Sequence, residues 1–178
     1  MTSAEERFTD WVREHHGFDP VRLVPRPELD GGGFAGVTAV APPPGRSVRG
    51  LVSDGAVLTY AVPGAFEAWL AAVDFANAAA SDADAVRFGQ VRQALEAPSA
   101  SGRAEAVIPL LYAQQVESAP AEHLAEPVRP PRLRDLDGDG RSVELWFQFE
   151  PGSRFEHWTF HVARDNALTV ERRPARER

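Results

Sequence analysis

The C-terminal third of the chain alternates hydrophobic and polar residues with the two-residue period of β-strands. Turn residues interrupt the alternation at Pro151-Gly152 and at 164–166, where Asn166 suits the left-handed position of a three-residue hairpin loop. The pattern therefore predicts an antiparallel meander of three strands, which cover residues 142–150, 154–163 and 167–172.

The alternation also predicts the register of this meander, because a slip by one residue would turn every side chain to the opposite face. One face is apolar and sets Leu145 opposite Trp158, Val143 and Val170 opposite Phe160, and Leu168 opposite Val162. The other face carries Glu144, Trp146, Gln148, Phe155, His157, Thr159 and His161, with Trp146 opposite His157 and Gln148 opposite Phe155. A solvated face rarely collects Trp, Phe and two His, so we expect either a helix to cover part of it or something to bind there.

The first third of the chain begins with a helical pattern. Ser3 and Glu6 fit a capping box, and Phe8, Trp11, Val12 and His15 form one stripe at helical spacing. Gly17 is a typical helix stop, so a helix is predicted over residues 4–16. Residues 18–33 are rich in Pro and Gly and are interpreted as a loop.

A strand over residues 34–40 and a hairpin follow. The hairpin joins residues 46–53 to 56–62 through Asp54-Gly55, a strong signal for a two-residue turn. This turn sets Leu51 opposite Leu58 and Val52 opposite Val57. Both faces near the turn are apolar, so we expect the hairpin to be covered on each side.

The middle of the chain predicts two helices. Phe66, Trp69, Leu70, Val73 and Asn77 follow helical spacing over residues 64–80. A second helix, capped by Ser81 or Asp82, is predicted to end near Glu96 and to bury Ala85, Phe88, Val91 and Leu95. Residues 106–111 fit either a short strand or a helix, and residues 117–134 are interpreted as an irregular, proline-rich arm.

These elements predict an α+β fold in which an antiparallel sheet, built from the N-terminal hairpin and the C-terminal meander, packs against about three helices. A length of 178 residues suits one domain. We expect this domain to span residues 1–172, followed by a frayed, charged tail over residues 173–178.

Composition narrows the function classes. Residues 1–126 hold 17 acidic residues and 9 arginines, a net charge of −8, which argues against a nucleic-acid partner. The absence of cysteine excludes disulfides and zinc–thiolate sites. We find neither a secretory signal nor a run of apolar residues that could span a membrane, so a cytoplasmic location is expected. All 19 basic residues are arginine, which is typical of a GC-rich bacterial genome.

Three motifs resemble ligand sites, and each has a simpler interpretation. Residues 31–36 match G-x-G-x-x-G, but prolines on both sides favour a loop. Asp135, Asp137 and Asp139 match the opening of an EF-hand loop, but Trp146 stands where the closing acid belongs. A turn is the simpler interpretation, and cation binding is left open. His157 and His161 lie about 13 Å apart along their strand, too far to share one metal ion. We therefore predict no metal and no cofactor.

The polar face of the meander supports three hypotheses on function. The first is a non-enzymatic protein-binding module of immunity, chaperone or accessory type, with Trp146, Phe155 and His157 as anchors. The second is a small-molecule binder or enzyme with a pocket around His157, in which His157 and Glu144 form an acid–base pair and Thr159 and His161 contribute polar groups. The third is a homodimer formed through residues 167–172 or through the polar face.

Overall fold

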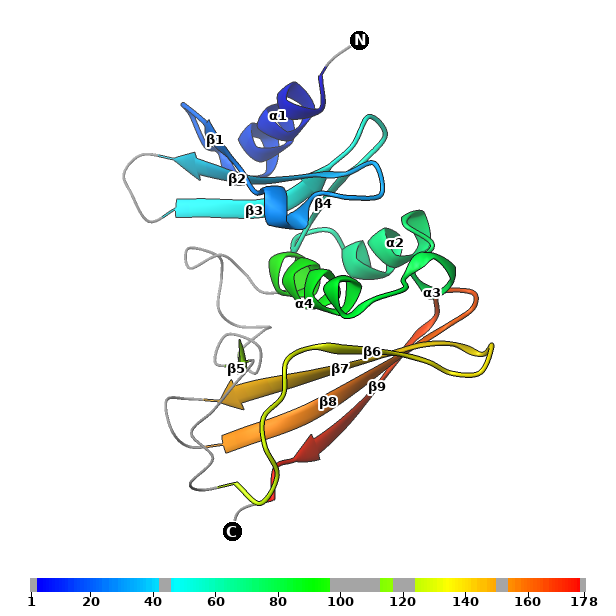
Figure 1. Ribbon diagram of the computed structural model, residues 1–178. Coiled ribbons are helices and arrows are strands. Elements are labelled where there is room, and N and C mark those ends of the chain that lie inside the picture. Colours follow the sequence, from blue (N-terminus) through cyan, green and yellow to red (C-terminus); the bar gives the residue numbers. More distant parts are fainter. Residues whose placement is uncertain (1–2, 42–45, 97–112, 117–123, 150–153, 177–178) are drawn as a thin grey trace. The chain divides into compact units, whose positions relative to one another are not determined.

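The computed structural model describes residues 3–41, 46–96, 113–116, 124–149 and 154–176. Within them the chain has the predicted α+β class, with helices and two antiparallel sheets (Figure 1). The N-terminal hairpin and the C-terminal meander belong to separate sheets, and not to the one sheet that the pattern predicts. Contacts divide it into two compact units. The first holds the described residues up to Trp69 and from Gln90 to Glu96, and the second holds Leu70–Gly89 and those from Ala113 onward. A single domain over 1–172 stays a prediction.

The first unit opens with helix α1 (Ala4–His16), as predicted. The Ser3 hydroxyl accepts from the Glu6 N–H at 3.2 Å, and the Glu6 carboxylate accepts from the Ser3 N–H at 2.8 Å. Gly17 ends the helix in the left-handed region, with φ 63°. The capping box and the glycine stop are therefore both confirmed.

The sheet of the first unit is antiparallel and has the strand order β1-β2-β3-β4. The bounds are β1 (Arg22–Pro25), β2 (Ala35–Ala41), β3 (Arg46–Val52) and β4 (Val57–Thr59), with a 3-10 turn η1 (Pro27–Leu29) between β1 and β2. Leu51 faces Leu58 and Val52 faces Val57, as predicted. The interpretation of residues 18–33 as a loop was wrong at β1, because an edge strand tolerates a proline at its end.

Helix α1 packs against one face of this sheet (Figure 1). Its buried Phe8 and Val12 join an apolar cluster that includes Val37, Val48 and Val52. The Phe8 ring comes close to the backbone of β3, because a Cβ at Gly50 would stand only 2.7 Å from Phe8 Cε2. A glycine is required at this contact.

The predicted helix over 64–80 is divided into α2 (Ala65–Ala72) and α3 (Phe75–Ala78). The break lies at Asp74, whose backbone is left-handed with φ 49°. Its carboxylate accepts from the side-chain amides of Asn77 at 2.6 Å and Asn166 at 3.2 Å, and these bonds hold the break. Helix α4 (Asp82–Glu96) agrees with the prediction, and Ala85, Phe88, Val91 and Leu95 are all buried.

The second unit contains a five-stranded antiparallel sheet. Its order is β5-β7-β8-β9, and β6 pairs with the same edge of β7 as β5 does. The bounds are β5 (Ala113–Val116), β6 (Arg132–Asp135), β7 (Gly140–Phe149), β8 (Arg154–Ala163) and β9 (Leu168–Pro174). Every predicted cross-strand pair of the meander is confirmed.

Two boundaries in this unit differ from the predictions. Strand β9 continues to Pro174, because Arg173 pairs with His157 and the Ala175 N–H donates to the Phe155 carbonyl at 2.8 Å. The last residues of the expected irregular arm form β6, which exists through its pairing with β7. The short run 106–111 lies outside the described residues.

The apolar face of this sheet is covered by helices of the same unit. Phe88 of α4 packs edge-on against Phe160, with ring centroids 5.1 Å apart, and Phe75 of α3 contacts Phe88 at 5.2 Å. The buried residues of the face are Val143, Leu145, Phe147, Trp158, Phe160 and Val162. Helices therefore cover the apolar face, and the polar face lies on the opposite side.

Candidate functional site

Residues 124–131, which we call the strap, cross the polar face of the second sheet (Figure 1). At one end the Ala125 N–H donates to the Arg176 carbonyl at 2.8 Å, and Glu126 binds Arg173 of β9. At the other end the chain enters β6, which pairs with β7 on the side of the sheet away from β9. The polar face is therefore crossed by an extended segment and not by a helix.

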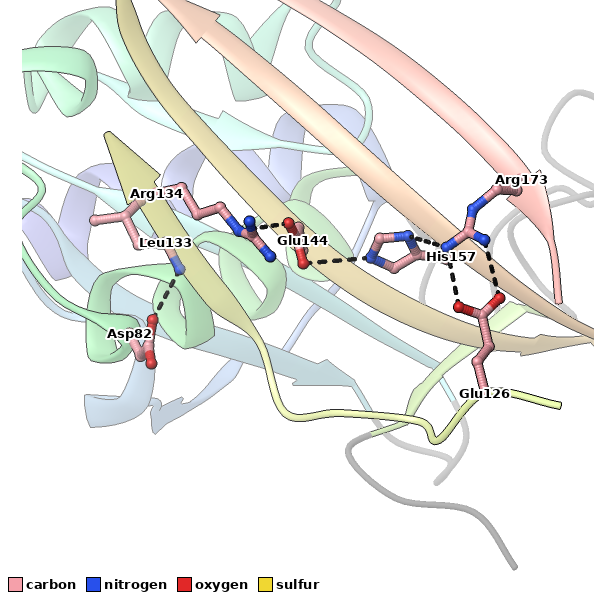
Figure 2. Close-up of polar contacts among 7 residues, drawn as sticks. All are labelled: Asp82, Glu126, Leu133, Arg134, Glu144, His157 and Arg173. Atoms are coloured by element: carbon pink, nitrogen blue, oxygen red, sulfur yellow. Dashed lines mark hydrogen bonds and ion pairs between the residues drawn. The ribbon is translucent and has the colours of Figure 1, made fainter. Parts of the chain in front are cut away.

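A row of ionisable side chains runs across this face from β6 to the strap (Figure 2). We call it the charged row, and it consists of Arg134, Glu144, His157, Arg173 and Glu126. Arg134 binds Glu144 at 2.7 Å, and Glu144 lies 3.6 Å from Nε2 of His157. Nδ1 of His157 lies 3.3 Å from Nη2 of Arg173. The two terminal nitrogens of Arg173, Nη1 and Nη2, donate to the Glu126 carboxylate at 3.0 and 3.2 Å. Each residue comes from a different element, so the row links four strands to the strap.

The strand pairing explains why these side chains meet. Glu144, His157 and Arg173 lie on successive strands and share one face, because His157 is the register partner of Arg173 and Glu144 is one pair removed. Asp82 at the start of α4 adds a further contact, since its carboxylate accepts from the Leu133 N–H at 2.8 Å (Figure 2). This bond satisfies one N–H on the outer edge of β6.

His157 is held as a neutral imidazole. An arginine nitrogen can only donate, so Nδ1 accepts from Arg173 and the proton resides on Nε2, toward Glu144. The side chain is 14% exposed, and this burial is the main reason that the pKa of His157 is lowered. The nearby Glu144 carboxylate raises the pKa, and the Arg173 guanidinium lowers it. The imidazole therefore acts as a polar bridge between two ion pairs.

Trp146 and His157 are neighbours, as predicted. Their ring centroids are 4.9 Å apart, and the Trp146 side chain is 4% exposed. Val116 of β5 pairs with Trp146 on its other side. Trp146 is therefore covered, and it contributes to the interior beneath the polar face and not to an exposed surface.

The remaining candidate residues are spread along the two strands. Gln148, Phe155 and Thr159 are half-buried, with Gln148 opposite Phe155. His161 lies beyond Thr159, and its Nε2 is 3.7 Å from Glu171. The structure thus joins Glu144 to His157 but leaves His161 outside the charged row. The described residues contain no group of three or more His, Asp or Glu side chains that could hold a metal ion.

Sequence reasoning missed Arg134, Arg173 and Glu126. Arg173 was open to prediction, because extending the register of the meander by one residue beyond 172 sets it opposite His157. Arg134 and Glu126 lie in the segment interpreted as an irregular arm, and their positions follow from tertiary pairing alone.

The two loop motifs have local roles. Asp135 binds Arg141 and accepts from the Gly138 N–H at 3.3 Å, as in an ordinary turn. In the glycine-rich segment, Gly31 and Phe34 exchange two backbone hydrogen bonds, and a strand follows where a dinucleotide site requires a helix. The glycine-rich motif therefore lacks the strand-to-helix context of a nucleotide site, and cation binding at Asp135, Asp137 and Asp139 stays untested.

Strand β9 presents an open edge. The bonds from Ala163 N to Ala167 O and from Ala175 N to Phe155 O direct the odd-numbered backbone groups toward β8. Because an antiparallel ladder alternates, the N–H and C=O groups of Leu168, Val170 and Arg172 point away from the sheet. Within the described part of the chain no strand pairs with them.

The side chains at this edge are exposed. Val170 is 39% exposed and lies opposite the fully buried Phe160. The Arg172 guanidinium stacks over the Trp158 ring at 4.1 Å. The apolar face of the sheet thus continues to its edge, where a valine and a stacked arginine meet solvent.

No helix in the described ranges has the length and apolar character needed to span a membrane. Comparison with protein-family models, with curated proteins and with solved structures gives no match for this chain.

Proposed function

We propose that this protein is a non-enzymatic protein-binding module that accepts a β-strand at the open edge of β9. The observation that carries the proposal is the outward direction of the N–H and C=O groups of Leu168, Val170 and Arg172. Such a row of backbone groups is a template for strand addition, in which main-chain hydrogen bonds supply affinity.

The contrast with the other edge strands supports this choice. Strands β1, β4, β5 and β6 each contain three or four residues, whereas β9 contains seven. On the outer edge of β6, the Leu133 N–H is already bound by Asp82. The charged side chains of β9 point to its two faces and are engaged there, since Arg173 binds Glu126 and Arg172 stacks on Trp158. They do not block the approach of a strand in the plane of the sheet.

The side chains beside the edge indicate the chemistry of the partner. Leu168, Val170 and Arg172 lie on the apolar face, in line with Val162, Phe160 and Trp158. An added strand would place alternate residues on this face, so we expect its apolar side chains to pack against Leu168 and Val170.

The proposal keeps the aromatic-rich C-terminal sheet as the binding element and moves the contact from Trp146 to β9, because Trp146 is 4% exposed. The same sheet provides Trp158 and Arg172, residue types that are favoured at interfaces. A role of immunity, chaperone or accessory type in the bacterial cytoplasm, with another protein or a second copy of this chain as partner, belongs to this proposal.

A second candidate function is small-molecule binding or catalysis at His157. The observation in its favour is the 3.6 Å approach of Glu144 to Nε2 of a neutral imidazole. We place it second because the charged groups around His157 already bind one another, Arg134 with Glu144 and Arg173 with Glu126. An NMR titration of the His157 ring against a metabolite library tests it, and a ligand that shifts this ring selectively would favour it over strand addition.

Photo-crosslinking tests the strand-addition proposal. A benzophenone amino acid replaces Val170 at the edge, and the control replaces Asp54 in the exposed turn of the other sheet. In cells of the source organism we expect a protein adduct from position 170 alone. An additional Leu168→Pro substitution, which removes an outward N–H, should abolish the adduct. Equal labelling from both positions, or none from position 170, would refute strand addition at β9.

A further inference from the structure

Resting on the proposed function, we infer that the partner strand is β9 of a second copy of this chain. The two β9 strands pair antiparallel about a two-fold axis at Val170 and join two C-terminal sheets into one. A two-fold interface of this kind uses the same surface on both copies, so the edge must be complementary to itself.

The backbone restricts the registers that can form. Both copies direct the N–H and C=O groups of Leu168, Val170 and Arg172 outward. A hydrogen-bonded ladder between them therefore requires even-numbered residues to lie opposite even-numbered residues. Pro174 lacks an N–H, and beyond it the Arg176 carbonyl is occupied by Ala125. The usable edge thus runs over 168–172, with Val170 at its centre.

The register centred on Val170 satisfies all of these groups. It sets Val170 opposite its own equivalent and Leu168 opposite Arg172 of the second copy, which gives three hydrogen-bonded pairs. The two valines bury the side chain that is 39% exposed in the single chain. Leu168 lies against the aliphatic stem of Arg172, and on the other face Glu171 lies opposite Thr169. No like charges are directly opposed.

The neighbouring registers are less favourable. Centring on Glu171 or on Arg172 sets two like charges opposite each other, and it uses Pro174 where a donor is needed. Centring on Thr169 sets Arg172 opposite Asn166, which lies in the hairpin turn with φ 62° and whose N–H is bound to Ala163. That ladder would lose its third pair. Val170 is therefore the position at which the edge best complements itself.

Net charge does not oppose this contact. The chain carries −7 in total, but residues 127–178 hold 10 arginines and 9 acidic residues, a net of +1. The segment that contains β9 is thus nearly neutral, and two copies can approach there without concentrated repulsion.

Single-cysteine variants test both the dimer and its register, because the chain contains no cysteine. With Val170→Cys, the two sulfurs face each other across the axis, and we expect a disulfide-linked dimer under mild oxidation. With Leu168→Cys, the equivalent residues lie about 13 Å apart along the strands, and no disulfide is expected. Preferential crosslinking of Thr169→Cys would reveal a slipped register and overturn the centring on Val170.

Sedimentation of the unmodified chain provides the second measurement. We expect a concentration-dependent dimer, which Val170→Pro converts to a monomer with unchanged circular dichroism, since the lost N–H points out of the sheet. Val170→Thr keeps the N–H and should remain dimeric. A chain that stays monomeric up to about 1 mM, the weak end of the affinity scale, refutes the inference. If position 170 then still crosslinks to a different protein in cells, strand addition survives, and if it crosslinks to nothing, both proposals fail.

Discussion

Replacing Phe160 by alanine should destabilise the second unit far more than the same truncation of its register partner Val170. The two residues lie opposite each other on the same face of adjacent strands. Phe160 is fully buried, and Val170 is 39% exposed. At one strand position, the pair therefore compares a large buried side chain with a smaller, partly exposed one.

The magnitude follows from the contacts of each side chain. The ring centroid of Phe160 lies 5.1 Å from that of Phe88 and 6.0 Å from that of Trp158, so the rings are in contact. Truncation of Phe160 therefore leaves a cavity between a helix and the sheet. Truncations of this kind cost about 3–5 kcal/mol. In the monomer, at concentrations below those at which it would pair, Val170→Ala removes methyl groups that are partly in water and should cost about 0.5 kcal/mol. For a chain of this length, each kcal/mol lowers Tm by about 2–4 °C, which gives losses of about 12 °C and about 2 °C.

Thermal unfolding followed by circular dichroism measures both losses, and hydrogen exchange at the β8 amides assigns them to the second unit. If Phe160→Ala prevents folding, Phe160→Leu keeps most of the volume and should cost less than about 1.5 kcal/mol. Equal and small shifts for the alanine variants at the two positions would show that Phe160 is not in the core and would refute the assigned register.

Three further predictions concern a cap, a turn and a histidine. Ser3→Ala should lower the free energy of unfolding by about 1 kcal/mol, with Ser3→Thr close to wild type in urea denaturation. Asn166→Ala should cost about 2 kcal/mol, because a left-handed residue (φ 62°) loses the amide that accepts from Ala76 N–H, and Asn166→Gly should recover part of it in the same assay. Burial lowers the pKa of His157 below its ordinary 6.5, so as the pH falls the unfolded chain takes up this proton at a higher pH than the folded chain does. Stability is therefore fully present above about pH 6.5 and falls as the pH decreases below it. His157→Gln should lose less stability than wild type between pH 7 and pH 5 in urea titrations, and equal losses would contradict the assignment.

The meander was predictable because its information is local. Trp158, Phe160 and Val162 alternate with polar residues, and Asn166 marks the turn that sets the next strand in register. Once the register was fixed, the contact between Trp146 and His157 followed from arithmetic along the strands. Hydrophobic alternation and turn chemistry agree here, so the sequence alone is sufficient.

The break between α2 and α3 could not be predicted, because its cause is distant in the sequence. The apolar spacing from Phe66 to Asn77 continues through it without interruption. Asp74 leaves the helix where its carboxylate meets Asn166, which lies 92 residues further along the chain. Local periodicity carries no information about such a contact.

Strand β6 shows the same limit for sheets. Three of its four residues are charged, so neither alternation nor β-propensity favours a strand there. It forms because the edge of β7 offers unpaired backbone groups, and Asp82 then binds one N–H on its outer edge. Its Arg134 reaches the charged row as a consequence of this pairing, which explains why Arg134 was not open to prediction, whereas Glu144, His157 and Arg173 follow from the register of the meander.

The strap has a consequence for how the chain is completed during synthesis. Glu126 is made before its partner Arg173, and 47 residues separate them. At about 5–20 residues per second, the ribosome needs about 2–9 s to reach that partner. Trp146 and His157 are added to the chain within this interval, before Arg173 is present to bind Glu126 of the strap. The strap is therefore fastened late, and a nascent chain that stops short of Arg173 leaves Glu126 without this partner and His157 without the donor to its Nδ1.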